Sequence, residues 1–358
     1  MQVAPMDVVH HPPSDLYLDP KNPRIGLEAF QLEDQQEILH WLWRNKSVNE
    51  LVDSILENGY WEHEELFATK EDRHLVVVEG NRRLAACKII SDPGIRETLG
   101  IPLHKEPSRQ VLDSIDKLPV ILKSRRELWS FVGFKHVNGP QTWDSIAKAE
   151  YVYNVRRDYG LSLAEIASGI GDRHETVTRL YRGFVVFRQA QKAFSFDSRH
   201  AQQPRFPFSH LWTALGYVSI REYLGVSPEM LEDENPVRRE QLPKLQHLMN
   251  WLFGDTSKNI ERKVRRQNPD LRHLATALET SKGIASLESG SSLSTALNAS
   301  LGDAHLFRNA LVRADINARK AMQFVSTGFN GESDLVETVE SLYKQARSLK
   351  DLTMIDES

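Results

Sequence analysis

The stretch Leu75-Val76-Val77-Val78-Glu79-Gly80-Asn81-Arg82-Arg83-Leu84-Ala85-Ala86 decides how the first part of this 358-residue chain folds. Its short, unbroken apolar start predicts a buried strand, and its end predicts a helix that continues to residue 90. Gly80 lies in the turn between them, where the lack of a Cβ lets the backbone approach a ligand closely. The first turn of the helix offers unpaired N–H groups and a partial positive charge, and Arg82 and Arg83 add guanidinium groups that suit phosphate oxygens. The turn therefore predicts an anion site, for a nucleotide phosphate or a nucleic-acid backbone. A plain turn whose arginines bridge surface carboxylates is the alternative.

The composition is that of an ordinary folded protein of two or three domains, with 40% hydrophobic and 26% charged residues in 41.0 kDa. No signal peptide and no apolar run of about 20 residues is recognisable, so we expect a cytoplasmic protein without membrane contact. A single cysteine, Cys87, excludes internal disulfides and cysteine-ligated structural zinc. The net charge of −4 argues against indiscriminate nucleic-acid binding, so any DNA contact must come from a local basic patch.

The pattern along the chain predicts an α+β protein in four stretches. Residues 1–13 are expected to form a loose leader, and residues 14–125 an α/β unit. From residue 126 onward the pattern is helical, with a helix-turn-helix unit over 126–200 and a helical C-terminal region over 201–358. The last part of that region, residues 307–349, predicts a pair of amphipathic helices split near Gly328.

The helix-turn-helix is predicted from spacing between residues 162 and 187. Ala167 is small enough for two helices to touch, Gly171 supplies the turn, and Val177 and Leu180 would pack the second helix on the first. The residues left facing outward suit a major groove, and they are the expected DNA contacts: Arg173, His174, Thr176, Arg179 and Arg182. An ordinary helical hairpin without a DNA role is the alternative.

The order of these features resembles the ParB/sulfiredoxin-like family. An opening box with Asn22 and Arg24, a helix over 48–59, a strand with a Gly-x-Arg-Arg box and then a helix-turn-helix follow one another as they do in ParB proteins. The resemblance implies an N-terminal ParB/sulfiredoxin-like α/β domain that binds a nucleoside triphosphate, CTP in preference to ATP. The residues that it implies for this role are Asn22, Arg24, Gly80, Asn81, Arg82 and Arg83.

The chain departs from that family at a third box, which in ParB proteins reads Glu-Asn-Leu-Gln-Arg and helps to hold magnesium. Here Lys135 and His136 fall near the acidic residue and the asparagine. Lysine cannot ligate magnesium but could neutralise phosphates, so we expect both residues at the nucleotide site and leave the metal site unassigned. Glu79 could serve as a catalytic base or magnesium ligand, although orientation of Arg82 is the favoured role.

The resulting hypothesis is a ParB-like DNA-binding protein, a homodimer, whose C-terminal region mediates self-association or contacts a protein partner. Nucleotide and DNA would each bias the arrangement of two subunits. One rival is an enzyme on the same fold, namely a nucleotide hydrolase, phosphotransferase or DNase. The other is a nucleotide-independent transcription regulator or partition adaptor. Plasmid partition and phage defence are both open as biological roles. Reductase chemistry is discounted, because Cys87 lies inside the predicted helix.

Overall fold

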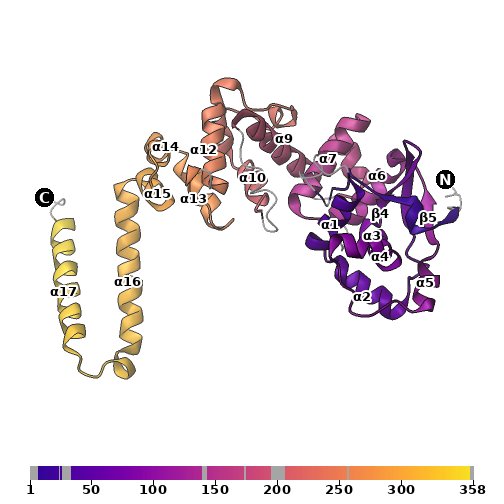
Figure 1. The fold of residues 1–358 in the computed structure, drawn as a ribbon. Helices are drawn as coiled ribbons and strands as arrows, with labels where there is room; N and C mark the ends of the chain where they lie inside the picture. The colour runs from indigo at the N-terminus through magenta and orange to yellow at the C-terminus, as the bar shows by residue number, and fades with distance from the viewer. Residues whose placement is uncertain are drawn as a thin grey trace.

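The computed structural model describes residues 7–23, 25, 34–138, 143–172, 175–194, 206–255 and 258–354. Arg24, Arg173 and His174, which were expected at functional sites, lie outside the described residues. An α/β unit forms one end of the molecule, a helical unit the middle, and two long helices the other end (Figure 1). The expected α+β class is therefore confirmed. No described helix is long and apolar enough to cross a membrane.

The described strands form one five-stranded mixed sheet in the order β1-β5-β3-β4-β2. Strands β2 and β4 run parallel, as do β3 and β5, and the other pairs are antiparallel. The strands are β1 (Val8–His11), β2 (Leu16–Leu18), β3 (Leu66–Glu71), β4 (His74–Glu79) and β5 (Leu118–Leu122). Because β1 pairs with β5, the sheet begins inside the stretch expected to be a loose leader, and that expectation is corrected for Val8–His11.

Helices pack on both faces of the sheet, and alternating strand residues serve the two faces. Val77 of β4 and Ala68 of β3 belong to a core shared with the helices between β2 and β5, whereas Val78 and Phe67 pack against the helices that follow β5. The first group comprises α1 (Gln35–Asn45), α2 (Val48–Asn58), α3 (Asn81–Ser91), α4 (Pro93–Leu99) and α5 (Arg109–Ile115), after the short 3-10 turn η1 (Pro13–Asp15). The second comprises α6 (Arg125–Gly133), the π-helical turn η3 (Phe134–Asn138) and α7 (Ser145–Tyr159).

The turn from β4 into α3 has the predicted form. Gly80 caps α3 with a φ of 101°, a left-handed conformation that side chains with a Cβ rarely adopt. A Cβ at this position would also clash with Cδ2 of Leu66, which is buried in the neighbouring strand. Most residues of α3 are buried around the whole helix, and they share one core with the sheet. The first turn of α3 is therefore held at the end of the sheet.

The helical unit is built around α9, which is longer than the short second helix predicted for this region. Its apolar residues pack against α7, α10 and α12 in one core that runs from Val137 to Ala296, across the boundary expected at residue 200. The helices are α8 (Leu163–Gly169), α9 (Thr176–Phe194), α10 (Ser209–Ala214), α11 (Val218–Leu224), α12 (Leu242–Phe253), α13 (Asp270–Ala277), α14 (Ser281–Glu288) and α15 (Leu293–Leu301), with 3-10 turns η5 (Met230–Glu232) and η6 (Arg239–Gln241).

The two terminal helices are confirmed as α16 (Asp303–Gly328) and α17 (Ser333–Thr353). Both are described along their whole length, and neither buries a single residue. Apolar side chains recur at helical spacing on α17, and those of Leu335, Val339, Leu342 and Leu349 are all exposed. Figure 1 shows both helices standing away from the rest of the protein.

Candidate anion site at the start of α3

A pocket of about 490 Å³ lies at the first turn of α3 and brings three distant segments together. Its lining includes Asn22 from the loop after β2, the turn of residues 79–83, and Lys135 from η3. These are the three boxes that the sequence resemblance had assigned to a single nucleotide site. Remaining parts of the wall come from α2 and from the loop that contains Tyr60 and Glu64.

Asn81 fixes the geometry of this turn from inside the protein. Its side-chain oxygen accepts a hydrogen bond from the Asp19 N–H at 2.8 Å, and its amide nitrogen donates to the Val77 carbonyl at 2.6 Å. Asn81 is only 4% exposed, so its side chain joins the loop after β2 to the end of β4. Any contact that Asn81 makes with a ligand would therefore use its backbone.

Both arginines of the turn lie in the pocket wall and are engaged by the protein itself. Arg83 donates to the backbone carbonyl of Glu64 and pairs with its carboxylate at 2.8 Å, and it lies 4.0 Å from Glu79. Arg82 donates to the Ser47 carbonyl at 2.9 Å. Both guanidinium groups thus lie at the pocket that the sequence predicted, but the Glu64 carboxylate already occupies that of Arg83. This carboxylate is 61% exposed, so it can leave Arg83 for water at little cost.

Glu79 lies beside Lys135 and His136, the two residues expected from the sequence at the nucleotide site. Its carboxylate is 2.8 Å from Lys135 Nζ and 2.7 Å from His136 Nε2. Burial alone would raise the pKa of Glu79, but the hydrogen bond from His136 and the charge of Lys135 lower it to about 2. Glu79 is therefore ionised at neutral pH and holds η3 against the end of β4. Its partners are Lys135, His136 and Arg83, which corrects the expected role of orienting Arg82.

Two buried donors on this pocket wall have no hydrogen-bond partner among the described residues. They are Nε of Arg82 and Nε1 of Trp143. Buried polar groups in proteins are nearly always paired, so these two donors are unusual among the described residues of the pocket wall. The Trp143 ring stacks on His136 with its centroid 4.6 Å away, which links it to the Glu79 cluster. Nothing in the local sequence around Trp143 had indicated this position.

The described residues offer little to a resident metal ion or to thiol chemistry. They contain no group of three or more histidine, cysteine or acidic side chains that could hold a metal. The oxygens of Glu79 are already taken by Lys135 and His136. Cys87 is fully buried inside α3, and burial raises the pKa of its thiol to about 12, in line with a packing role.

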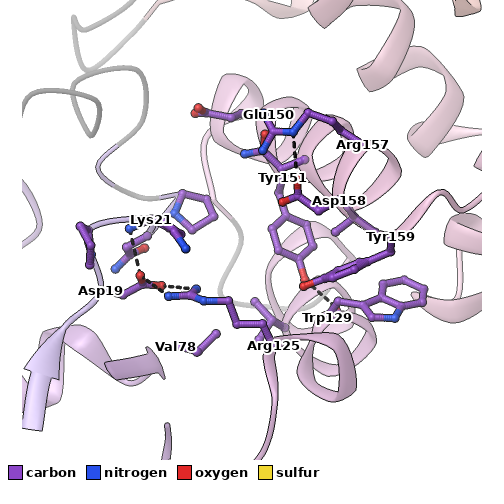
Figure 2. Close-up of a pocket in the computed structure, with 16 residues that line it drawn as sticks. Asp19, Lys21, Val78, Arg125, Trp129, Glu150, Tyr151, Arg157, Asp158 and Tyr159 are labelled. Carbon is purple, nitrogen blue, oxygen red and sulfur yellow. Dashed lines mark hydrogen bonds and ion pairs between the residues drawn. The ribbon is translucent and has the colours of Figure 1, made fainter. Parts of the chain in front are cut away.

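A second cavity, of about 680 Å³, lies between the α/β unit and α6 and α7. Arg125 bridges its floor, because it pairs with both oxygens of Asp19 at 2.7 and 2.8 Å (Figure 2). Arg125 also pairs with Glu71. Glu150 extends from α7 on the opposite side of this space. One oxygen of Glu150 has no partner among the described residues, and burial raises the pKa of this carboxyl to about 7.

The predicted DNA-binding hairpin forms with the expected internal contacts. Gly171 makes the turn with a φ of 69°, and Val177 and Leu180 are buried. Fewer of the expected DNA-contacting residues of α9 point outward than the sequence predicted. Arg179 is exposed and Thr176 is half-buried, whereas Arg182 pairs with Glu232 at 3.2 Å. The outward orientation of Arg182 is therefore corrected, and Arg179 is the exposed basic residue in the first turn of α9.

Comparison with known proteins adds a likeness at the level of structure. No protein-family model matches the sequence, and no curated protein matches it either. Among solved structures, the chain is similar to the C-terminally truncated chromosome-partitioning protein ParB from Caulobacter crescentus complexed to the centromeric parS site. The two are 11% identical with a TM-score of 0.30, over 63% of this chain and 96% of the other. At this level of similarity, function has to be inferred from the residues of the site.

We expect Glu150 to make the protein less stable as pH rises. The pKa of its carboxyl is raised from 4.5 to about 7 in the folded state, so the folded protein binds more protons than the unfolded chain between these values. The free energy of unfolding should therefore fall across this window, by an amount on the order of 3 kcal/mol. Glu150→Gln should remove this loss and be more stable than the parent protein at about pH 8. Urea unfolding at several pH values measures the effect.

The exposed Glu37→Gln on α1 is the control and should leave the pH profile unchanged. Identical profiles for Glu150→Gln and the parent protein would contradict the assigned burial of this carboxyl.

Proposed function

We propose that this protein is a ParB-like DNA-binding protein whose α/β unit binds a nucleoside triphosphate in the pocket at the start of α3. The observation that carries this is the meeting of Asn22, the Gly80–Arg83 turn and Lys135 in one pocket. A volume of about 490 Å³ lies within the range of small-molecule sites. Of the functions considered from the sequence, nucleotide binding explains more of the residues that meet in this pocket than an enzyme or a nucleotide-independent regulator does.

The chemistry of the pocket suits a chain of phosphates. Arg82, Arg83 and Lys135 supply three cations against the carboxylates of Glu64 and Glu79. Guanidinium groups bind phosphate oxygens through two parallel hydrogen bonds, and the start of a helix adds a favourable field. In this account the phosphates take the place of the Glu64 carboxylate on Arg83 and supply an acceptor for Arg82 Nε. CTP is the nucleotide that the family resemblance implies, with ATP as the alternative.

Binding without hydrolysis is the version of this function that the residues favour. A general base works best when its pKa lies near the operating pH, and the pKa of Glu79 is far below it. A lysine and a histidine already occupy the carboxylate of Glu79, so it has no free oxygen with which to activate a water molecule. The proposed role of the nucleotide is accordingly that of a ligand that favours one arrangement of two subunits.

The proposed DNA contact lies at the first turn of α9. This end of the helix carries the exposed Arg179 and the half-buried Thr176, whereas residues 180–190 in the middle of α9 are largely packed inside the helical unit. A helix that enters a major groove by its N-terminal end can read bases with few side chains. Few phosphate contacts are implied, so affinity for DNA should fall only moderately with salt.

Self-association is proposed through α16 and α17. Exposed apolar stripes of this length normally mark an interaction surface, and two such hairpins can bury them in a four-helix bundle. Symmetry makes a second copy of the chain the simplest partner, since one surface then serves both subunits. In such a homodimer, nucleotide and DNA could both act on the same equilibrium, namely the arrangement of the two subunits.

Replacing the arginines of the turn should weaken nucleotide binding. Arg82→Ala or Arg83→Ala removes charge-assisted hydrogen bonds, and each should lower the affinity for the preferred triphosphate by roughly 10-fold or more. A screen of melting temperature against CTP, ATP, GTP and UTP identifies that triphosphate, and calorimetric titration gives the affinity. A ligand at a hundredfold excess over its dissociation constant stabilises the folded protein by about 2.7 kcal/mol. The exposed Arg44→Ala should bind like the parent protein, and unchanged binding by both turn variants would refute the assignment.

Replacing two arginines of α9 one at a time should show that Arg179 contacts DNA and that Arg182 has a structural role. We expect Arg179→Ala to weaken binding to a fluorescent mixed-sequence duplex and to reduce the slope of affinity against salt by about one contact. Arg182→Ala leaves Glu232 without its partner, so it should lower the melting temperature and change DNA affinity little. Equal loss of DNA affinity in both variants would contradict the proposed position of the helix.

A charge placed on the apolar stripe of α17 should dissociate the dimer. Leu342→Asp puts a carboxylate where the bundle would bury it, whereas Ser341→Asp places the same charge one residue away, off the stripe. Sedimentation velocity should find a dimer for the parent protein and for Ser341→Asp, and a monomer for Leu342→Asp. A parent protein that sediments as a monomer at all accessible concentrations would overturn this part of the account.

A further inference from the structure

The segment between α12 and α13 concentrates positive charge in a chain whose net charge is −4. Residues 255–273 contain six arginine or lysine side chains and three acidic ones, so this segment has an excess of three positive charges. Its four arginines are all exposed, and they are Arg262, Arg265, Arg266 and Arg272. Residues 258–272, called the basic segment below, lie outside the helix-turn-helix and are not used by the functions proposed above.

The acidic side chains near the basic segment neutralise few of its cations. Asp255 is 5% exposed and pairs with Lys258 at 2.9 Å, and Glu261 lies 3.7 Å from Arg265. Three guanidinium groups have neither an ion-pair partner nor a hydrogen-bond acceptor among the described residues. They belong to Arg262, Arg266 and Arg272. The basic segment therefore offers three exposed arginines to a partner from outside the chain.

The backbone of the basic segment is fixed although most of it is not helical. Val264 is fully buried in the core of the helical unit. The neighbouring Lys263 turns inward, where its Nζ donates to two backbone carbonyls after α14 at 2.6 and 3.0 Å. The Asp270 carboxylate accepts hydrogen bonds from the N–H groups of Arg265 and Arg266 at 2.8 and 2.9 Å. Because these contacts already hold the backbone, a ligand has to order only the arginine side chains.

The basic segment is attached to the same packed unit as α9. Val264 shares one core with the apolar residues of α9. Gln267 donates to Thr213 of α10 at 2.9 Å, and α10 in turn crosses α9 so closely at Gly183 that a Cβ there would lie 3.1 Å from Cβ of Trp212 (Figure 1). The first turn of α9 and the basic segment therefore belong to one packed body and meet a ligand together.

We propose that the basic segment is a second DNA contact, which binds the phosphate backbone and does not read the sequence. Guanidinium groups bind phosphate oxygens through paired hydrogen bonds, and DNA carries one charge per about 1.7 Å of its axis, so neighbouring arginines can each reach a phosphate. The inference rests on the proposed function in its choice of DNA as the polyanion. A second contact on the same body as α9 binds at high effective concentration and raises affinity for every sequence.

Neutralising the three unpaired arginines together tests the proposal. The variant Arg262→Gln/Arg266→Gln/Arg272→Gln loses no described ion pair, so its melting temperature should stay that of the parent protein. Its affinity for a fluorescent mixed-sequence duplex of several helical turns, measured by anisotropy, should fall by roughly tenfold or more at low salt. The slope of log affinity against log salt should become shallower by about 2 to 3, as expected for the loss of three phosphate contacts.

A charge-matched variant separates a local contact from general attraction. Arg44→Gln/Lys70→Gln/Lys117→Gln removes the same charge from exposed positions of the α/β unit and should bind the duplex like the parent protein. An equal loss of affinity in the two triple variants, or an unchanged salt slope in the basic-segment variant, would overturn the proposal.

Crosslinking gives the position of the contact independently of affinity. Cys87 is the single cysteine and is fully buried, so a photocrosslinker can be attached selectively to a new surface cysteine. Arg266→Cys should crosslink to the duplex, and Lys70→Cys should not. If Arg179→Ala weakens binding and the basic-segment variant does not, this inference fails and the α9 contact stands. The reverse result would remove the α9 contact and leave the basic segment as the DNA site.

Discussion

The buried hydrogen bond from the Asp19 N–H to the Asn81 side chain is the constraint on which both cavities depend. It joins the loop after β2 to the first residue of α3, and so places Asn22 beside the arginine turn. The Asp19 carboxylate continues the connection to Arg125 at the start of α6. Through these contacts, one short network sets the floor of the larger cavity and the outer wall of the smaller one.

Within the smaller pocket, the protein balances its own cations before any ligand arrives. Glu79 holds Lys135 and His136 from a buried position, whereas Glu64 holds Arg83 from the surface. A phosphate can therefore displace one of these carboxylates from its basic partner more easily than the other. Leaving the exposed Glu64 in water costs little, but moving Glu79 would leave charges buried and unpaired. A polyanion is accordingly expected to compete with Glu64 and to leave the Glu79 cluster intact.

Local sequence patterns predicted the elements of the site, and contacts between distant residues decided the rest. The apolar run and Gly80 were sufficient to predict β4, the turn and α3, because strand period and backbone freedom are local properties. The pairing of Arg182 with Glu232, fifty residues further along the chain, has no local signal, and it withdrew a side chain expected to face DNA. Glu150 looked like any surface glutamate in the sequence, since burial of one side chain depends on the whole helical packing.

The most direct test of the central claim is a crystal structure of the protein with a nucleoside triphosphate or inorganic tripolyphosphate. We expect phosphate density beside Arg82, Arg83 and Lys135, with the Glu64 carboxylate moved away from Arg83. An empty pocket, with Glu64 still bound to Arg83 at saturating ligand, would contradict it.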